Sequence, residues 1–125
     1  MSHLNVGESS AVMHYGETQP DRFREGWQRR VIHTGKLMMV VIDVENGPWP
    51  EPDPPHSHPH EQIAYVAEGE VLFICEGSEP QHLKAGDVYA IAPNKPHTIR
   101  LLSRRARLVD TFHPIREDFI TSPES

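Results

Sequence analysis

The sequence contains a single cysteine, Cys75, so no disulfide bond can form within one chain. The absence of an internal disulfide is typical of a reducing compartment, and we expect a cytoplasmic location. Cys75 ends the apolar run 71–75, where we expect a small buried side chain rather than a reactive nucleophile.

Long apolar runs and an excess of basic charge are also missing. No apolar run reaches the roughly 20 residues that a membrane-spanning helix needs, and the first residues lack the basic start and apolar core of a secretory signal. Lysine and arginine number 12 against 18 acidic residues, whereas a nucleic-acid-binding surface is expected to be basic. We therefore predict no membrane partner and no nucleic-acid partner.

At 125 residues, the chain is predicted to form one compact unit with two short flanking segments. Residues 1–27 are polar and poorly periodic, and we interpret them as an N-terminal arm. Strands are predicted to begin near Gln28. The division that follows is an arm over 1–27, a barrel over 28–114 and a C-terminal tail over 115–125.

Short apolar segments separated by turn residues predict an all-β fold. Residues 63–74 fit two strands joined by a tight turn at 68–70. The run 36–44 is apolar at both odd and even positions, which a half-exposed strand would not show. We expect one of its faces to fill the barrel and the other to be covered by a second sheet or another subunit.

Histidine is abundant, with nine in the chain. His56, His58 and Gln62 are separated by even numbers of residues at the predicted start of a strand, where alternate side chains share one face. Two imidazoles and an amide oxygen on one face can occupy three positions around a divalent metal, and His97 is the candidate fourth ligand. The alternative is an exposed His-rich loop that binds metal adventitiously.

Two residues near this group are open to more than one interpretation. His60 has the same parity as the candidate ligands, but Pro59 makes strict alternation doubtful. Trp49 lies in the proline-rich segment 46–55, which is expected to be stiff and to fix the positions of the histidines that follow. We expect Trp49 either to cover a bound substrate or to anchor this loop on the barrel wall.

The spacing of these residues resembles the two sequence motifs of the cupin family. The first motif occurs as His56-x-His58-x3-Gln62-x6-Gly69, and the second as Gly86-Asp87-x4-Ala92-Pro93-Asn94-x2-His97. The resemblance implies a cupin double-stranded β-helix, or jelly-roll barrel. It also implies one divalent transition metal (Ni, Zn, Fe, Mn or Cu), held by His56, His58, Gln62 and His97. Gln62 stands where most cupins carry glutamate.

A narrower resemblance lies in the segment 110–119, DTFHPIREDF. It is similar to the terminal segment of small bacterial cupins that linearise uronates in pectin and alginate degradation. This resemblance implies an enzyme that converts an unsaturated uronate from its ring form to an open-chain keto acid. In it Asp110 would move the proton, Phe112 would pack on the sugar ring and Arg116 would bind the carboxylate.

The residues themselves allow these roles and also simpler ones. A carboxylate that is partly removed from water can have its pKa raised toward neutrality, which suits Asp110 for acid–base catalysis. A salt bridge to a nearby arginine is the alternative. Arg116 can hold a carboxylate in a two-pronged contact, but it can equally pair with Glu117 or Asp118.

Three neutral imidazoles and a neutral amide would leave the full charge on a bound dication, which favours Lewis-acid chemistry. Other functions stay open, because a fold does not determine its chemistry. They are a cupin dioxygenase acting on a phenol or flavonoid, a polyketide cyclase, and a non-catalytic module that binds a small acid. The doubly apolar run 37–44 and the N-terminal arm further predict a homodimer formed by sheet packing.

Overall fold

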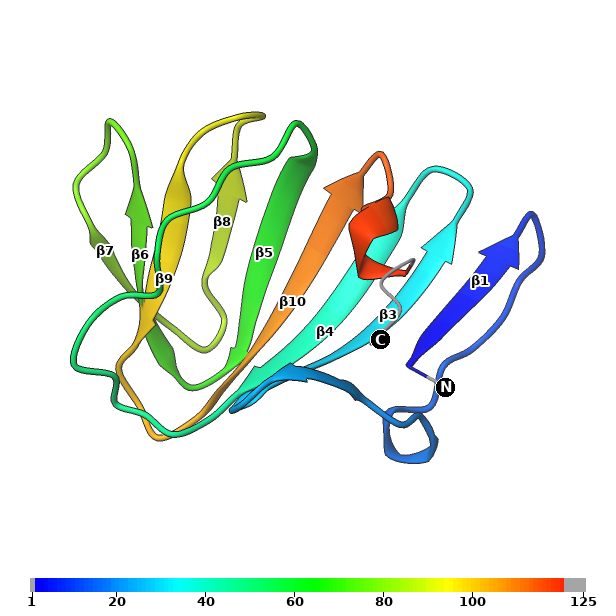
Figure 1. The fold of residues 1–125 in the computed structure, drawn as a ribbon, viewed down its shortest axis with the longest axis horizontal. Helices are drawn as coiled ribbons and strands as arrows, with labels where there is room; N and C mark the ends of the chain where they lie inside the picture. The colour runs from blue at the N-terminus through cyan, green and yellow to red at the C-terminus, as the bar shows by residue number, and fades with distance from the viewer. Residues whose placement is uncertain (1, 121–125) are drawn as a thin grey trace.

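The computed structural model describes residues 2–120, which form two β-sheets and two short 3-10 helices (Figure 1). Residues 121–125 of the predicted tail lie outside the described residues. The strands are β1 (His3–Gly7), β2 (Asp21–Arg24), β3 (Trp27–Thr34), β4 (Met38–Val44), β5 (Glu61–Glu68), β6 (Glu70–Cys75), β7 (Gln81–Lys84), β8 (Val88–Ile91), β9 (His97–Leu101) and β10 (Ala106–His113). The 3-10 helices are η1 (Tyr15–Glu17) and η2 (Glu117–Phe119).

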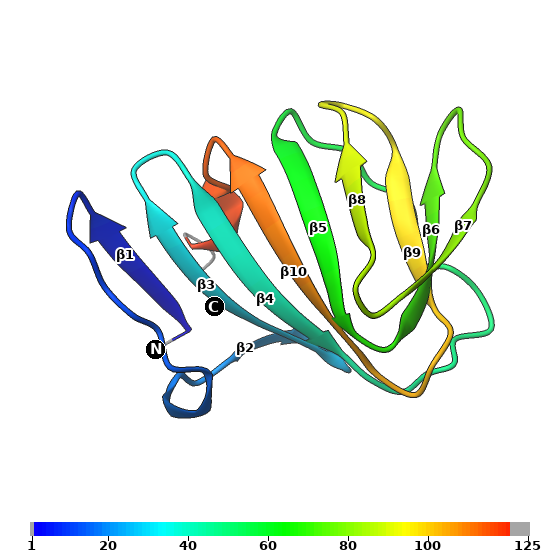
Figure 2. The same ribbon diagram turned by 180° about the vertical axis from the view of Figure 1, so that it is seen from behind.

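The larger sheet has the strand order β1-β3-β4-β10-β5-β8, with β2 paired to β3, and the smaller sheet has the order β7-β6-β9. Figures 1 and 2 show the two sheets curving toward each other as the walls of one barrel. β10 lies between β4 and β5, so its inward side chains are central to the larger sheet. No helix in the described residues is long and apolar enough to cross a membrane.

The core follows from the alternation of side chains along the central strands. In β4, Met38, Val40 and Val44 are fully buried, whereas Met39 is 43% exposed. Val66 and Leu101, from β5 and β9, complete the same core. Within one chain, the outward apolar face of β4 therefore stays partly open to solvent.

Strands begin earlier than Gln28, where the sequence predicted the first of them. β1 pairs with β3 in parallel, and β2 pairs with β3 antiparallel. β1 and β2 are held at the edge of the sheet by backbone hydrogen bonds, which do not require an alternating pattern of apolar side chains. Their polar sequences therefore gave no strand signal. Two parts of the predicted arm, β1 and β2, are thus strands of the larger sheet (Figure 2).

Strand register places the later site residues on one inner face. Phe112 of β10 lies opposite Gln62 of β5, and Asp110 lies opposite Ala64. Gln62 in turn lies opposite Ile91 of β8. Since inward positions recur every second residue, Asp110 and Phe112 point into the barrel beside Gln62.

Candidate metal centre and its cavity

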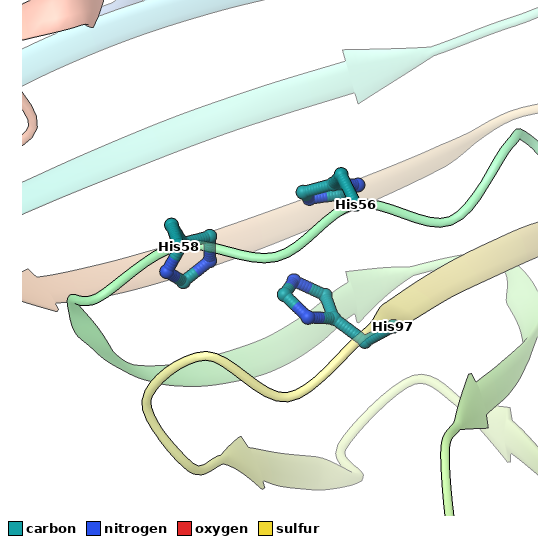
Figure 3. A group of neighbouring side chains, drawn as sticks. All are labelled: His56, His58 and His97. Atoms are coloured by element: carbon teal, nitrogen blue, oxygen red, sulfur yellow. The ribbon is translucent and has the colours of Figure 1, made fainter.

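Three histidines from two separate segments gather at one end of the barrel (Figure 3). His56 and His58 lie on the loop before β5, and His97 is the first residue of β9. Their ring nitrogens offer one ligand atom each, and these atoms lie within 4.8 Å of one another. A reciprocal backbone pair between His56 and His97, with N–H to C=O distances of 3.0 and 2.9 Å, fixes the spacing of the two segments.

Backbone carbonyls determine which nitrogen of two of these rings carries the proton. Nδ1 of His97 lies 2.7 Å from the carbonyl of Lys95, and Nδ1 of His58 lies 3.1 Å from the carbonyl of His60. A carbonyl only accepts a hydrogen bond, so each Nδ1 is the donor and each neutral ring keeps a lone pair on Nε2. A second-shell carbonyl of this kind is typical of metal-binding histidines.

The two lone pairs are the strongest sign of a cation site. Nε2 of His97 is buried and has no hydrogen-bond partner among the described residues. Nε2 of His58 faces Oε1 of Gln62 at 2.9 Å, so two acceptors point at each other. Because Gln62 is also a hydrogen-bond partner of Asp110, its amide nitrogen is directed to that carboxyl group and its oxygen to His58. These donor atoms fit a divalent transition metal.

The electrostatics keep all three rings neutral. Removal from water is the largest cause that lowers the pKa of His56, His58 and His97, and the positive charge of Arg116 lowers each further. Only the neutral imidazole can bind a metal ion. The site is therefore ready to bind metal at neutral pH.

The neighbours of the histidine cluster take other roles. His56 and His58 precede β5, which begins only at Glu61, so the loop rather than regular strand pairing holds them. His60 lies outside the group of three, and its ring packs near Phe112 at 6.5 Å between ring centroids. Trp49 packs against Trp27 in a tilted arrangement, with 5.5 Å between ring centroids, and its indole N–H donates to a backbone carbonyl. Trp49 therefore anchors the loop on the barrel wall, which is the second of its two predicted roles.

The cluster opens into a cavity of about 350 Å³, a size typical of small-molecule sites. Six of the seven predicted site residues line it: His56, Gln62, His97, Asp110, Phe112 and Arg116. The seventh, His58, packs against the Phe112 ring at 5.6 Å between centroids. The structure thus brings together residues that are up to 60 positions apart in the sequence.

Asp110 is a buried carboxyl group on the wall of this cavity. Burial is the largest influence and raises its pKa to about 7, against the opposing effects of Gln62 and Arg116. Its Oδ1 has no hydrogen-bond partner, and no arginine within residues 2–120 forms an ion pair with it. The salt-bridge alternative does not hold in the structure.

Arg116 reaches the cavity while it is already paired. Its Nε donates to Oδ1 of Asp118 at 3.1 Å, and its Nη2 donates to Oδ2 at 2.7 Å. Asp118 holds a depressed pKa, because these contacts outweigh its desolvation. The ion pair that sequence analysis offered as an alternative is present, but it engages only one edge of the guanidinium. Nη1 lies on the other edge.

Three further residues on the cavity wall were not found by sequence reasoning: Arg29, Tyr89 and Phe119. Arg29 has the parity of the buried residues Val31 and His33, so a charged residue on an apolar strand face was the available signal. Burial, together with the nearby Asp110, raises the pKa of Tyr89 well above its ordinary value. Phe119 follows the last strand and carried no signal of its own.

Comparison with known proteins identifies the family of this chain. The family model for the cupin domain matches residues 41–112. The pectin degradation protein KdgF of Dickeya dadantii (strain 3937) is 38% identical over 106 residues, covering 83% of this chain and 93% of that protein.

Two solved structures have the same fold. An RmlC-like cupin from Shewanella frigidimarina NCIMB 400 has a TM-score of 0.78 and 31% identity, covering 89% of this chain and 96% of the other. KdgF from Halomonas sp. has a TM-score of 0.78 and 29% identity, covering 87% and 99%. The predicted all-β jelly-roll barrel and the resemblance to proteins of pectin degradation are confirmed. Because the family model spans more than half of the sequence, this chain belongs to the cupin family.

Proposed function

We propose that this protein is a metal-dependent enzyme that converts unsaturated uronates from the ring form to the open-chain keto acid. The observation that carries the proposal is one cavity that combines three convergent histidines with a buried carboxyl group and an arginine. The 38% identity to a pectin degradation protein supports the substrate class.

His56, His58, Gln62 and His97 would hold one divalent transition metal. When bound, the metal would act as a Lewis acid toward the sugar oxygens, because its four neutral ligands leave its charge uncompensated. Nε2 of His97, which is partnerless among the described residues, together with Nε2 of His58 facing Oε1 of Gln62, supports this ligand set. The donor types do not select among nickel, zinc, iron, manganese and copper.

Asp110 would move the proton in the reaction. As a carboxylate it would accept the proton of the anomeric hydroxyl, while the bond between C1 and the ring oxygen breaks and its electron pair goes to that oxygen. The same proton would then be returned to C4, so that the enolate becomes a ketone and no atom is gained or lost. A pKa of about 7 supports both halves of this transfer at neutral pH.

Arg116 and Phe112 would orient the substrate. The guanidinium lies over the Phe112 ring at 5.2 Å and carries its charge beside the cavity, where a substrate carboxylate could be bound. Phe112 is only 2% exposed, so it would act as a fixed wall against which the sugar ring packs.

The direct test follows the loss of the conjugated-enol absorbance of an unsaturated uronate, using metal-loaded and metal-free protein. We expect only the metal-loaded protein to speed this loss above the spontaneous rate. If it does not, the uronate proposal is wrong. Oxygen uptake with phenolic substrates would then test the dioxygenase alternative, and acid binding without turnover would indicate a binding module.

We also propose that two copies pack through the outer face of the larger sheet. Four large apolar side chains on that face are 43–63% exposed: Met39, Ile63, Tyr65 and Val88. Strand pairing makes them neighbours, since Tyr65 lies opposite Val88 and Thr111 lies opposite both Met39 and Ile63. One apolar face on each copy suits a two-fold interface, and sedimentation as a stable monomer at micromolar concentration would contradict it. The cytoplasmic location stays a prediction.

A further inference from the structure

One wall of the cavity is a stack in which aromatic rings alternate with guanidinium groups. Arg29 lies between the rings of Phe23 and Phe119, with its Cζ 4.3 Å from each centroid. Arg116 lies over two rings of the same wall. Its Cζ is 4.1 Å from the centroid of Phe119 and 5.2 Å from the centroid of Phe112. The order along the stack is therefore Phe23, Arg29, Phe119, Arg116 and Phe112.

The members of this stack come from four parts of the chain. Phe23 belongs to β2, Arg29 to β3 and Phe112 to β10, whereas Arg116 and Phe119 flank or belong to η2. All five line the cavity. Phe119 is the central layer, because it contacts both guanidinium groups and also meets Phe112 edge to face at 5.6 Å.

Two aspartates partly offset the repulsion between the two positively charged guanidinium groups. Arg29 pairs with Asp21 at 3.2 Å in a buried contact, and Arg116 pairs with Asp118 through two hydrogen bonds. Arg116 and Arg29 both lie over the Phe119 ring and repel each other. Burial is the largest cause that lowers the pKa of Arg29, and the charge of Arg116 lowers it further. Each aspartate offsets part of this repulsion.

Asp118 also restricts how Arg116 can be oriented. A planar guanidinium that is held by a carboxylate along its Nε and Nη2 edge, and by rings on its faces, has few rotamers left. Arg116 is 13% exposed, while Asp118 is 59% exposed. The aspartate is thus the more exposed partner of the pair, and Nη1 takes no part in the two hydrogen bonds to it.

We infer that Phe119 and Asp118 are positioning residues that fix Arg116 for binding the substrate carboxylate, an inference that rests on the proposed function. They act through Arg116 and touch no reacting atom. A preorganised guanidinium loses little freedom when the carboxylate binds, so its contribution is to substrate affinity. The N-terminal strand β2 supports the same wall through Phe23.

The experiment compares Asp118→Asn and Phe119→Leu with the wild-type protein. We expect KM for the unsaturated uronate to rise by about tenfold in each, the equivalent of one cation–π or charge-assisted contact, while kcat changes little. Phe119→Tyr keeps the ring and should restore the wild-type KM. The matched control is Tyr15→Leu, which removes a ring that lies between Arg30 and Arg107 away from the cavity.

A second readout does not depend on turnover. The Nε–H signal of Arg116 can be followed in nitrogen-15 NMR spectra and assigned by its absence from Arg116→Lys. We expect a distinct signal in the wild type. In Asp118→Asn and Phe119→Leu the signal should be lost or shifted to the position of free arginine. An unchanged KM and an unchanged Nε–H signal in both Asp118→Asn and Phe119→Leu would overturn the inference. If the wild type turns over no uronate but the signal is lost as expected, the proposed function fails while the positioning stands.

Discussion

The chain builds the same arrangement twice, on opposite faces of one strand. Arg29 and Arg30 are consecutive residues of β3, so their side chains leave the sheet on opposite sides. Inside the barrel, Phe119 lies between Arg29 and Arg116. Outside it, Tyr15 lies between Arg30 and Arg107, with Cζ atoms 3.8 and 4.3 Å from the ring centroid.

The two stacks differ in how their charges are satisfied. In the outer stack, the single carboxylate of Asp43 accepts from Arg107 at 2.8 Å, from Arg30 at 3.4 Å and from the Tyr15 hydroxyl at 2.8 Å. Its side-chain hydrogen bond and charge raise the pKa of Arg107. This network is complete in itself, and its role is to fasten the N-terminal segment to the sheet.

The inner stack is not closed in this way. Phe119 has no polar group, and each guanidinium has an aspartate of its own rather than a shared one. Arg116, which lines the cavity, uses only Nε and Nη2 in its pairing with Asp118. In the outer stack, one carboxylate bonds to every polar member, and the stack stabilises the fold. In the inner stack, Nη1 of Arg116 takes no part in the pairing with Asp118, which prepares this arginine to bind a ligand.

Removing a histidine of the metal centre should have the largest effect. His97→Ala deletes an inner-face ligand, so metal content and uronate turnover should both be lost. The loss should exceed the roughly 10- to 100-fold that an outer-shell partner contributes to metal affinity. Asp43→Asn, which opens only the outer network, should keep full metal content. Elemental analysis of both purified variants decides the matter, and stoichiometric metal in His97→Ala would show that the site is elsewhere.

Asp110→Asn should lower kcat by roughly 100- to 10,000-fold, the range typical of general acid–base catalysis. The substitution keeps the shape of the side chain and removes its ability to accept a proton. Metal content should hold, because Asp110 is outside the ligand set. Wild-type turnover in this variant would remove Asp110 from the mechanism and leave the inner face with a binding role only.

The same variant has an effect on stability that depends on pH. Burial raises the pKa of Asp110 from 3.8 to about 7 in the folded protein, so folding favours the protonated form. The stabilising contribution is complete below the unfolded pKa and is lost as pH rises through about 7. In metal-free protein, Asp110→Asn should therefore gain stability relative to wild type between pH 5 and pH 8, on the order of a few kcal/mol. Urea unfolding at both pH values measures the gain, and equal differences would contradict it.

Much of this architecture was predictable because its signals are local. The candidate ligands His56, His58 and Gln62 lie within one short segment, and the spacing of the second motif adds His97. The two strands predicted within 63–74, joined by a turn at 68–70, also followed from local pattern, and the structure contains them as β5 (Glu61–Glu68) and β6 (Glu70–Cys75).

The inner stack was not predictable, because it depends on contacts between distant segments. Arg29 packs against Phe23 and Phe119, which come from segments far apart in the sequence. Sequence alternation marks Arg29 as inward-facing but does not name its partners. The pairing of Arg116 with Asp118 was one of two alternatives, and only three-dimensional packing shows that one edge of the guanidinium is left over.

A matched pair of arginine variants tests the comparison directly. Arg116→Lys keeps the positive charge but loses the planar group, so kcat/KM should fall by about 10- to 100-fold, mainly through KM. Arg107→Lys makes the same change in the outer stack and should alter kcat/KM by less than about twofold. Steady-state kinetics on both variants provides the measurement. Equal losses would show that the two stacks do not have separate roles.

The smallest expected effect is that of Tyr15→Phe. The substitution keeps the ring between Arg30 and Arg107 and removes only the hydroxyl that donates to Asp43. One partly exposed hydrogen bond contributes about 0.5–1 kcal/mol, so the free energy of unfolding should fall by that amount. Asp43 keeps its two arginine donors, so metal content and KM should match those of the wild type, as denaturant unfolding and kinetics on one preparation would show. Arg29 and Arg30 share a backbone, however, and a change in KM beyond about twofold would mean that strain passes through β3 from the outer stack to the inner one.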